Sequence, residues 1–224
     1  MNNVETLLVV WQDEVSRSYY HIGTLSYYNG LYNFSYTSMD DKKGLGEALK
    51  NGYMIHPTFP DITKSYYSKK LFSAFDRRIP SSDRKDFHEI LKDLGLDENA
   101  SKMAILRATR GRLAGDTYSF EQPLNLGNDH HLRSNFFIHG MRHQELPDDW
   151  STWIEGQNSL ELVQEPENEV DPFAVAIYTK DGKRIGYIPT FYSFSERENP
   201  LRCDSTPFRD GMIVRSVKGW LLPS

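Results

Sequence analysis

An Asn-Gly pair between two strand-like segments is the feature that most constrains the fold of this chain. Asn29-Gly30 separates residues 19–28 from residues 31–37, and polar and aromatic side chains alternate in the second segment. Both central residues of a type I′ hairpin turn need positive φ, which Asn and Gly adopt readily. Residues 5–12 (ETLLVVWQ) form a further apolar run. We therefore predict that the chain begins with an antiparallel β-meander.

Helical patterns follow this meander. Residues 38–62 contain several Gly and Pro residues and are expected to be irregular. Helices are predicted over residues 65–75, 82–94 and 98–109 because apolar residues recur there at helical spacing. Residues 116–120 (DTYSF) alternate as a strand does. Residues 121–133 are polar and without periodicity, and we expect them to be a linker.

The remaining residues predict a second, β-rich domain. Short strands are expected over residues 136–140, 159–163, 174–178, 184–188 and 211–218. Short strands separated by turn signals are typical of a small barrel or sandwich. The predicted fold class is therefore α+β, with a β-meander plus helices in residues 1–120, a linker at 121–133, and a small β-barrel in 134–224.

Charge and composition limit the function. The net charge is −5, and residues 134–224 contain 9 basic and 14 acidic side chains, so any nucleic-acid contact there should be small and local. The single cysteine, Cys203, cannot form an internal disulfide, which favours a reducing, cytoplasmic location. Apolar runs are too short to span a membrane. The sequence shows no nucleophile–base pair, phosphate loop or metal-ligand set, so we expect neither an enzyme nor a cofactor or metal, the histidines at 130, 131, 139 and 143 included.

Residues 160–189 contain the most distinctive motif. Glu165-Pro166-Glu167-Asn168-Glu169 precedes Asp171 and an apolar strand, and Gly186-Tyr187-Ile188-Pro189 follows. Upstream, residues 137–143 (FIHGMRH) place a basic and an aromatic side chain after a glycine. Together these segments resemble the HIRAN domain over residues 134–224. The resemblance implies an OB-like β-barrel that binds the 3′-hydroxyl end of single-stranded DNA.

The same resemblance implies roles for individual residues. Arg142 would contact a phosphate, and His143 would stack on a base. Asn168 and Asp171 would flank the terminal nucleotide, and Asp171 would accept a hydrogen bond from its hydroxyl. Tyr187 is a further candidate stacking surface. A carboxylate is a strong acceptor for a hydroxyl, a guanidinium can hold a phosphate with two hydrogen bonds, and aromatic stacking tolerates any base.

Each candidate also has a structural interpretation. Asn168 and Asp171 are typical of Asx-turns in a loop. Tyr187 is typical of the core side of a strand, and Arg142 is typical of an exposed surface. His143 stands where a Tyr would stack more strongly, and Val170 stands where the family often has another aromatic residue. The alternative is therefore a HIRAN-like module that binds protein rather than DNA.

Residues 5–120 resemble the N-terminal subdomain of HipA-type toxin kinases. The resemblance rests on residues 22–25, 32–36, 71–75, Pro80, Arg84 and the Ile105–Phe120 segment. The kinase core does not follow, because residues 134–224 have the pattern of β-strands and no kinase phosphate loop or catalytic motif. The resemblance implies a bacterial, non-enzymatic docking protein in a toxin–antitoxin, defence or repair context. Its partner would be a HipA-type kinase or an antitoxin.

Overall fold

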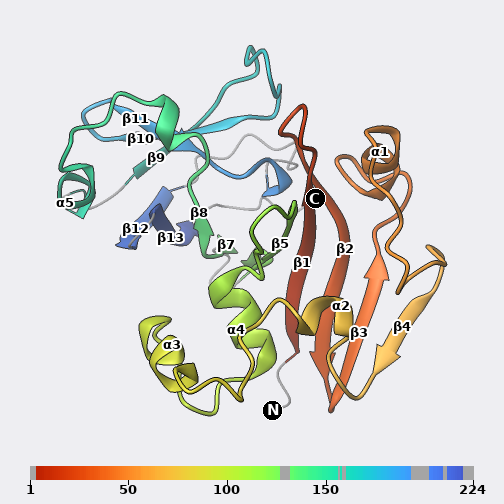
Figure 1. Cartoon of the computed structure of the whole chain (residues 1–224). Coiled ribbons are helices and arrows are strands. Elements are labelled where there is room, and N and C mark those ends of the chain that lie inside the picture. The colour runs from red at the N-terminus through yellow and green to blue at the C-terminus, as the bar shows by residue number, and fades with distance from the viewer. Residues whose placement is uncertain are drawn as a thin grey trace. The chain divides into compact units, whose positions relative to one another are not determined.

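The chain forms two compact units, residues 1–123 and 124–224 (Figure 1). The computed structural model describes residues 4–126, 132–155, 157, 160–192, 202–208 and 211–218, and each unit is described by itself.

The first unit is built on a five-stranded antiparallel sheet with the order β4-β3-β2-β1-β5. Its strands are β1 (Glu5–Gln12), β2 (Tyr19–Tyr28), β3 (Leu31–Tyr36), β4 (Ser65–Ser68) and β5 (Tyr118–Glu121). Asn29 and Gly30 connect β2 to β3 with φ values of 49° and 79°, as a type I′ turn requires. The predicted meander and the closing strand, which pairs with β1, are both confirmed.

The core of this unit lies between the sheet and three short helices. Leu7, Leu25 and Phe34 are neighbours across β1, β2 and β3, and all three are buried. Helices α1 (Leu45–Lys50), α2 (Ser73–Asp76) and α4 (Lys102–Thr109) add apolar side chains to the same cluster. A further helix, α3 (Phe87–Asp93), buries Leu91 outside this cluster. The side chains of one sheet face thus meet the apolar sides of the helices.

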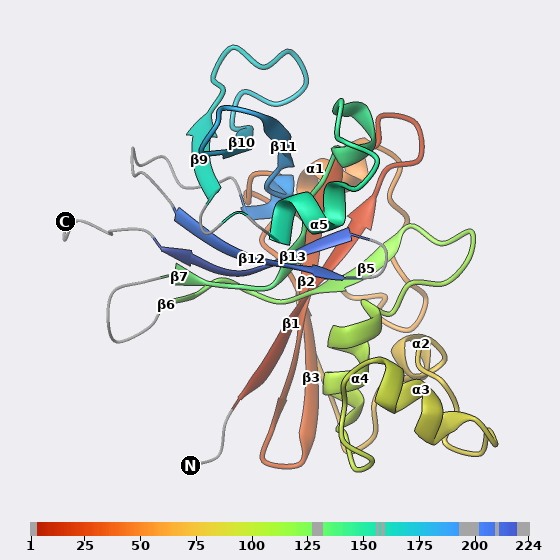
Figure 2. The same cartoon turned by 90° about the vertical axis from the view of Figure 1, so that its left-hand side faces the viewer.

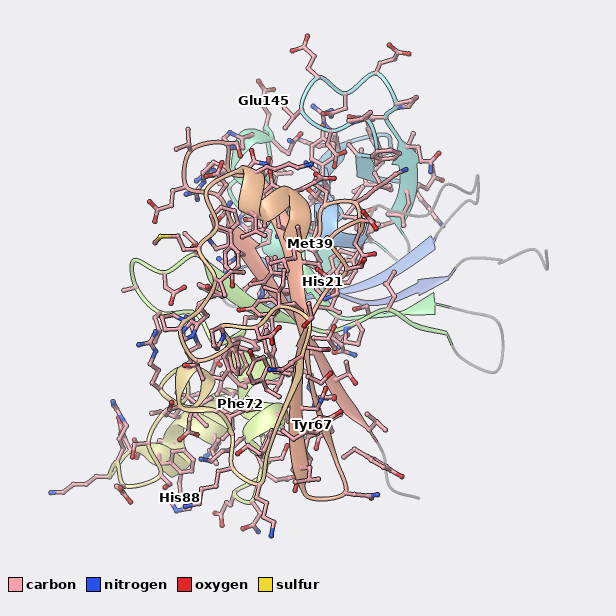
Figure 3. All side chains as sticks on the ribbon, turned by 90° about the vertical axis from the view of Figure 1, so that its right-hand side faces the viewer. His21, Met39, Tyr67, Phe72, His88 and Glu145 are labelled. Carbon is pink, nitrogen blue, oxygen red and sulfur yellow. The ribbon has the colours of Figure 1, made fainter. Side chains whose placement is uncertain are left out.

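The helix predicted over residues 65–75 is wrong in its first half. Residues 65–68 are strand β4, which pairs with β3 at the edge of the sheet, and only Ser73–Asp76 is helical. Tyr66 packs its ring 5.1 Å from that of Phe59, and Tyr67 is exposed (Figure 3). Tyrosine fits a half-buried pleated surface well, and this pairing outweighs the helical spacing.

The other helix boundaries also differ from the prediction. The second helix begins at Phe87 rather than 82, and the third at Lys102 rather than 98, where the Ser101 side chain accepts a hydrogen bond from the Ala104 amide at 3.0 Å. Helix α1 lies inside the segment that we expected to be irregular. A Cβ at Gly46 would lie 2.1 Å from the Met39 carbonyl oxygen, so glycine is required there for close approach rather than for irregularity.

The second unit contains a six-stranded sheet with the order β11-β10-β9-β12-β13-β8. Strands β9 to β13 of this sheet are labelled in Figure 2. Its strands are β8 (Phe136–Phe137), β9 (Leu160–Gln164), β10 (Val175–Thr179), β11 (Arg184–Tyr187), β12 (Arg202–Phe208) and β13 (Gly211–Lys218). After β8, His139 forms a bridge to Tyr187 of β11, with each amide donating to the other carbonyl at 2.9 Å. Strands β8 and β11 are the two edges of the sheet, and the segment that follows β8 therefore pairs with β11.

The remaining elements of this unit are short. They are β6 (Asn125–Leu126), β7 (Leu132–Arg133), η1 (Met141–His143), α5 (Trp150–Glu155) and η2 (Thr190–Tyr192). The buried core consists of Phe136, Ile138, Ile154, Leu160, Val175, Ile177, Ile185 and Ile188. Four predicted strands correspond to β9, β10, β11 and β13. The first, expected over residues 136–140, is reduced to β8 and the His139 bridge, and Gly140, at φ 73°, leads the chain into η1. Elements β12 and α5 were not predicted, and neither were β6 and β7, which pair with each other within the segment 121–133 that we expected to be a linker.

Candidate nucleic-acid interface

The η1 turn presents two of the predicted site residues to solvent. Gly140 adopts the left-handed conformation, which lets the chain leave the His139 bridge and turn immediately. Arg142 and His143 are both exposed, and the Arg142 Nε donates to His143 Nε2 at 3.0 Å. The turn places a guanidinium and an imidazole side by side on the surface.

The loop between β9 and β10 contains two further predicted site residues, Asn168 and Asp171. The Asn168 Oδ1 accepts hydrogen bonds from the amides of Val170 and Asp171 at 3.0 and 3.1 Å, which is an Asx-type turn. Asp171 is buried, and its Oδ1 accepts from the Phe173 amide at 2.9 Å. Both side chains therefore order the loop, as the structural interpretation of this motif expects. Among the described residues, none donates a hydrogen bond to the second carboxylate oxygen of Asp171.

Glu165, at the start of this loop, is the centre of a polar network that the sequence did not predict. Its Oε2 accepts from the Asn168 amide group at 3.1 Å and from the Tyr187 hydroxyl at 3.0 Å. Its Oε1 accepts from Tyr178 and from the Arg184 guanidinium, both at 3.2 Å. Four donors on two strands and one loop thus converge on one carboxylate.

Arg184 extends this network to the η1 turn. Its Nε donates to Gln144 Oε1 at 2.9 Å, and its NH1 nitrogen donates to the Tyr187 hydroxyl at 2.9 Å. The guanidinium carbon also lies 5.4 Å from the centroid of the Tyr187 ring. Because Gln144 directly follows His143 in the chain, the network reaches the turn that presents the exposed basic pair.

The ionisation of this network follows from its hydrogen bonds. Burial raises the pKa of Glu165, but hydrogen bonds from Asn168, Tyr187, Arg184 and Tyr178 together lower the pKa below its ordinary value. Burial also raises the pKa of the Tyr187 hydroxyl, with a further rise from the adjacent Glu165 carboxylate. At neutral pH the network therefore contains a carboxylate, a guanidinium and a neutral phenol.

Comparison with known proteins bears on the second unit. A family model of the HIRAN domain matches residues 131–195. No curated protein and no solved structure matches the chain. Residues 131–195 include η1, the β9–β10 loop and β11, so all five predicted site residues lie within the matched HIRAN region. The family is known for DNA binding, which is consistent with a nucleic-acid-binding role for this unit.

The predicted residues of the HIRAN region fall into two linked groups. Asn168 and Tyr187 meet at Glu165, and Asp171 is joined to Asn168 through the loop turn. Among the described residues, no hydrogen bond joins Arg142 or His143 to these three, but the η1 turn that contains both residues is joined to β11. Gly140 lies against the Tyr187 ring, because a Cβ added to it would be 3.4 Å from that ring. Gln144 accepts a hydrogen bond from Arg184.

Sequence reasoning missed Glu165, Arg184, Tyr178 and Gln144. A signal existed only for Glu165, because it is the first residue of the same Glu-Pro-x-Asn motif that led to Asn168. No group of three or more potential metal ligands occurs in the described residues, and His130 and His131 lie outside them. No helix in the described part of the chain is long and apolar enough to cross a membrane.

Proposed function

We propose that the second unit binds the 3′-hydroxyl end of single-stranded DNA and has no catalytic role. The six-stranded sheet and the His139–Tyr187 bridge are consistent with the small OB-like barrel that the HIRAN resemblance implies. The observation that most supports the proposal is the position of two exposed side chains, Arg142 and His143, on a turn tied to the Asn168 loop within the matched region.

Each side chain is suited to one part of a terminal nucleotide. The Arg142 guanidinium would hold a phosphate, and the exposed His143 ring would stack on a base. The Asp171 carboxylate oxygen that accepts no hydrogen bond from the described residues would accept one from the terminal hydroxyl. The ring of Tyr187 lies against the Arg184 guanidinium and its hydroxyl bonds to Glu165, so we assign Tyr187 to supporting the site rather than to stacking.

The acidic balance of this half of the chain fits an end-specific contact. Residues 134–224 contain 9 basic and 14 acidic side chains, so affinity cannot come from extensive phosphate neutralisation. A contact made by one guanidinium, one ring and one hydroxyl acceptor needs little net positive charge. Binding should therefore depend weakly on salt and strongly on the chemistry of the strand end.

The proposal is tested by fluorescence anisotropy with the full chain. Two labelled single strands of the same sequence, one ending in a 3′-hydroxyl and one in a 3′-phosphate, are titrated at constant salt. We expect micromolar binding to the hydroxyl strand and binding at least about tenfold weaker to the phosphate strand. Equal affinity for the two strands would contradict end recognition, whereas no binding to either would remove the nucleic-acid role.

One observation favours a second function, in which the module binds protein. Val170 and Phe173 are 85% and 39% exposed on a loop that also contains the exposed Glu167 and Glu169. Exposed apolar side chains among carboxylates suit a basic, apolar protein segment better than a phosphate backbone. The unit at residues 1–123 would then serve as the HipA-like docking domain of a regulator. Co-purification with a neighbouring kinase or antitoxin, unaffected by Arg142→Ala with Asp171→Ala, would favour this function.

A further inference from the structure

The orientation of the Asn168 side chain depends on Glu165. The Asn168 Oδ1 must face the main-chain amides of Val170 and Asp171, because an amide rotated by half a turn would point its own N–H₂ group at them. The Glu165 carboxylate accepts from the Asn168 Nδ2 at 3.1 Å and so selects the orientation that the loop requires. The loop that positions Asp171 is therefore held from its first residue.

The same carboxylate also holds the opposite side of the interface. It accepts from the Tyr187 hydroxyl and from Arg184, and Arg184 in turn donates to Gln144 on the far end of η1. Gln144 closes the turn by donating to the Gly140 carbonyl at 3.4 Å. One residue is thus connected, through side-chain hydrogen bonds alone, to both segments that contain the candidate DNA contacts.

From these contacts we infer that Glu165 is a positioning residue: it sets the geometry between the Asn168–Asp171 loop and the turn with Arg142 and His143. This inference rests on the proposed function for its role in binding, and on the hydrogen bonds alone for its role in the free protein. The side chains of Glu165 and Arg184 are 22% and 39% exposed, so the pair lies near the surface. Their charges cancel, and the Glu165 carboxylate therefore repels an incoming phosphate less than an isolated carboxylate would.

The test uses the full chain with Glu165→Gln and the matched control Glu167→Gln. Both variants remove one carboxylate from the same loop, but Glu167 is exposed and makes no hydrogen bond through its side chain among the described residues. Amide exchange of Val170 and Asp171 is measured by NMR without DNA, and binding to 3′-hydroxyl and 3′-phosphate strands is measured by anisotropy. In Glu165→Gln we expect exchange at both amides to rise about tenfold while Ile177 in β10 is unchanged.

In Glu165→Gln the ratio of the affinities for the 3′-hydroxyl and 3′-phosphate strands should fall about tenfold, whereas Glu167→Gln should keep the wild-type ratio. Unchanged exchange together with an unchanged preference in Glu165→Gln overturns the inference, as does an equal effect of Glu167→Gln. If the wild-type chain binds neither strand but exchange still rises in Glu165→Gln, the proposed function fails while the positioning of the loop is supported.

A milder variant covers the case in which Glu165→Gln does not fold. Tyr187→Phe removes one hydroxyl that donates to Glu165 and accepts from Arg184, and it keeps the ring and every charge. In this variant the ratio of the affinities for the 3′-hydroxyl and 3′-phosphate strands should fall about threefold, and the salt dependence of binding should be unchanged. A preference equal to that of the wild type would overturn the inference.

Discussion

In the part of the chain that the structure describes, Asp171 accepts a side-chain hydrogen bond through one carboxylate oxygen, from the Phe173 amide at 2.9 Å, and the residue is 8% exposed. The two oxygens therefore have separable roles. Asp171→Asn keeps an oxygen for the amide and replaces the other with an N–H₂ donor. We expect it to lower the unfolding free energy by less than about 1 kcal/mol and to abolish the preference for a 3′-hydroxyl. Urea denaturation and anisotropy measure the two effects.

Asp171→Ala is the matched comparison for this prediction. It removes both oxygens and should cost about 1 kcal/mol more than the Asn variant, because the Phe173 amide loses this partly buried hydrogen bond. If Asp171→Asn retained the full preference for a 3′-hydroxyl, the carboxylate would have only its role in the loop turn.

Arg142→Gln should weaken binding without affecting the fold. Arg142 is exposed and its described hydrogen bond is to the neighbouring His143, so the unfolding free energy should change by less than about 0.5 kcal/mol. If the guanidinium neutralises one phosphate, the slope of log K against log salt should become shallower by about 0.7 for a single strand. Titrations at several salt concentrations measure this slope, and an unchanged slope would show that Arg142 contacts no phosphate.

The sheet of the first unit was predictable where its signals are local. The turn at Asn29-Gly30 and the alternation in β3 depend only on neighbouring residues, and both are confirmed. Strand β4 was not predictable, because residues 65–68 become a strand by pairing with β3, which lies some thirty positions earlier in the chain. Strand β12 contains Pro207, which normally argues against a strand.

The candidate site was predictable in part for the same reason. The Glu-Pro-x-Asn motif led to Asn168 and Asp171, whose contacts are mostly within the loop itself. The role of Glu165 depends instead on donors from β10 and β11, and the bond between Arg184 and Gln144 joins residues that are 40 positions apart. No local pattern indicates such a bond, so the network could be recognised only in the structure.

Glu121→Ala should strongly destabilise the first unit. The Glu121 carboxylate forms an ion pair with the Arg110 guanidinium through two guanidinium nitrogens, and both residues are buried. Removing the carboxylate from a buried pair leaves a desolvated positive charge and costs about 3–5 kcal/mol of unfolding free energy. Urea denaturation measures the loss. Asp86→Ala, which breaks the exposed pair with Arg84, is the control and should give no measurable change.

The stability of the second unit should depend on the ionisation of Glu165. Burial raises the folded-state pKa of Glu165, but four hydrogen bonds outweigh burial and lower this pKa below its ordinary value. The Glu165 carboxylate therefore takes up its proton at a higher pH in the unfolded chain than in the folded chain. The resulting stabilisation is complete above the unfolded pKa, about 4.5, and is lost as pH falls through the folded pKa.

The difference in unfolding free energy between the wild type and Glu165→Gln should therefore be constant from about pH 7 to about pH 5.5 and should shrink towards about pH 3. Denaturation at each pH measures it. Tyr187→Phe, which removes one of the four hydrogen bonds, should show a smaller pH-dependent loss than Glu165→Gln. A difference that grows as pH falls would have the wrong sign and would contradict the lowered pKa.

Gly186→Ala should destabilise the second unit more than Gly182→Ala, although both glycines have positive φ, at 151° and 81°. A Cβ at Gly186 would lie 2.4 Å from Ile138 Cγ2 and 2.5 Å from the His139 carbonyl oxygen, whereas one at Gly182 would meet nothing within 4 Å. Gly182→Ala should cost about 1 kcal/mol from backbone strain alone, and Gly186→Ala about 3 kcal/mol from strain and overpacking. Urea denaturation of both variants measures the difference. Equal losses would show that the β11 backbone can move away from the His139 bridge, and the bridge would then be too weak to fix η1 beside β11.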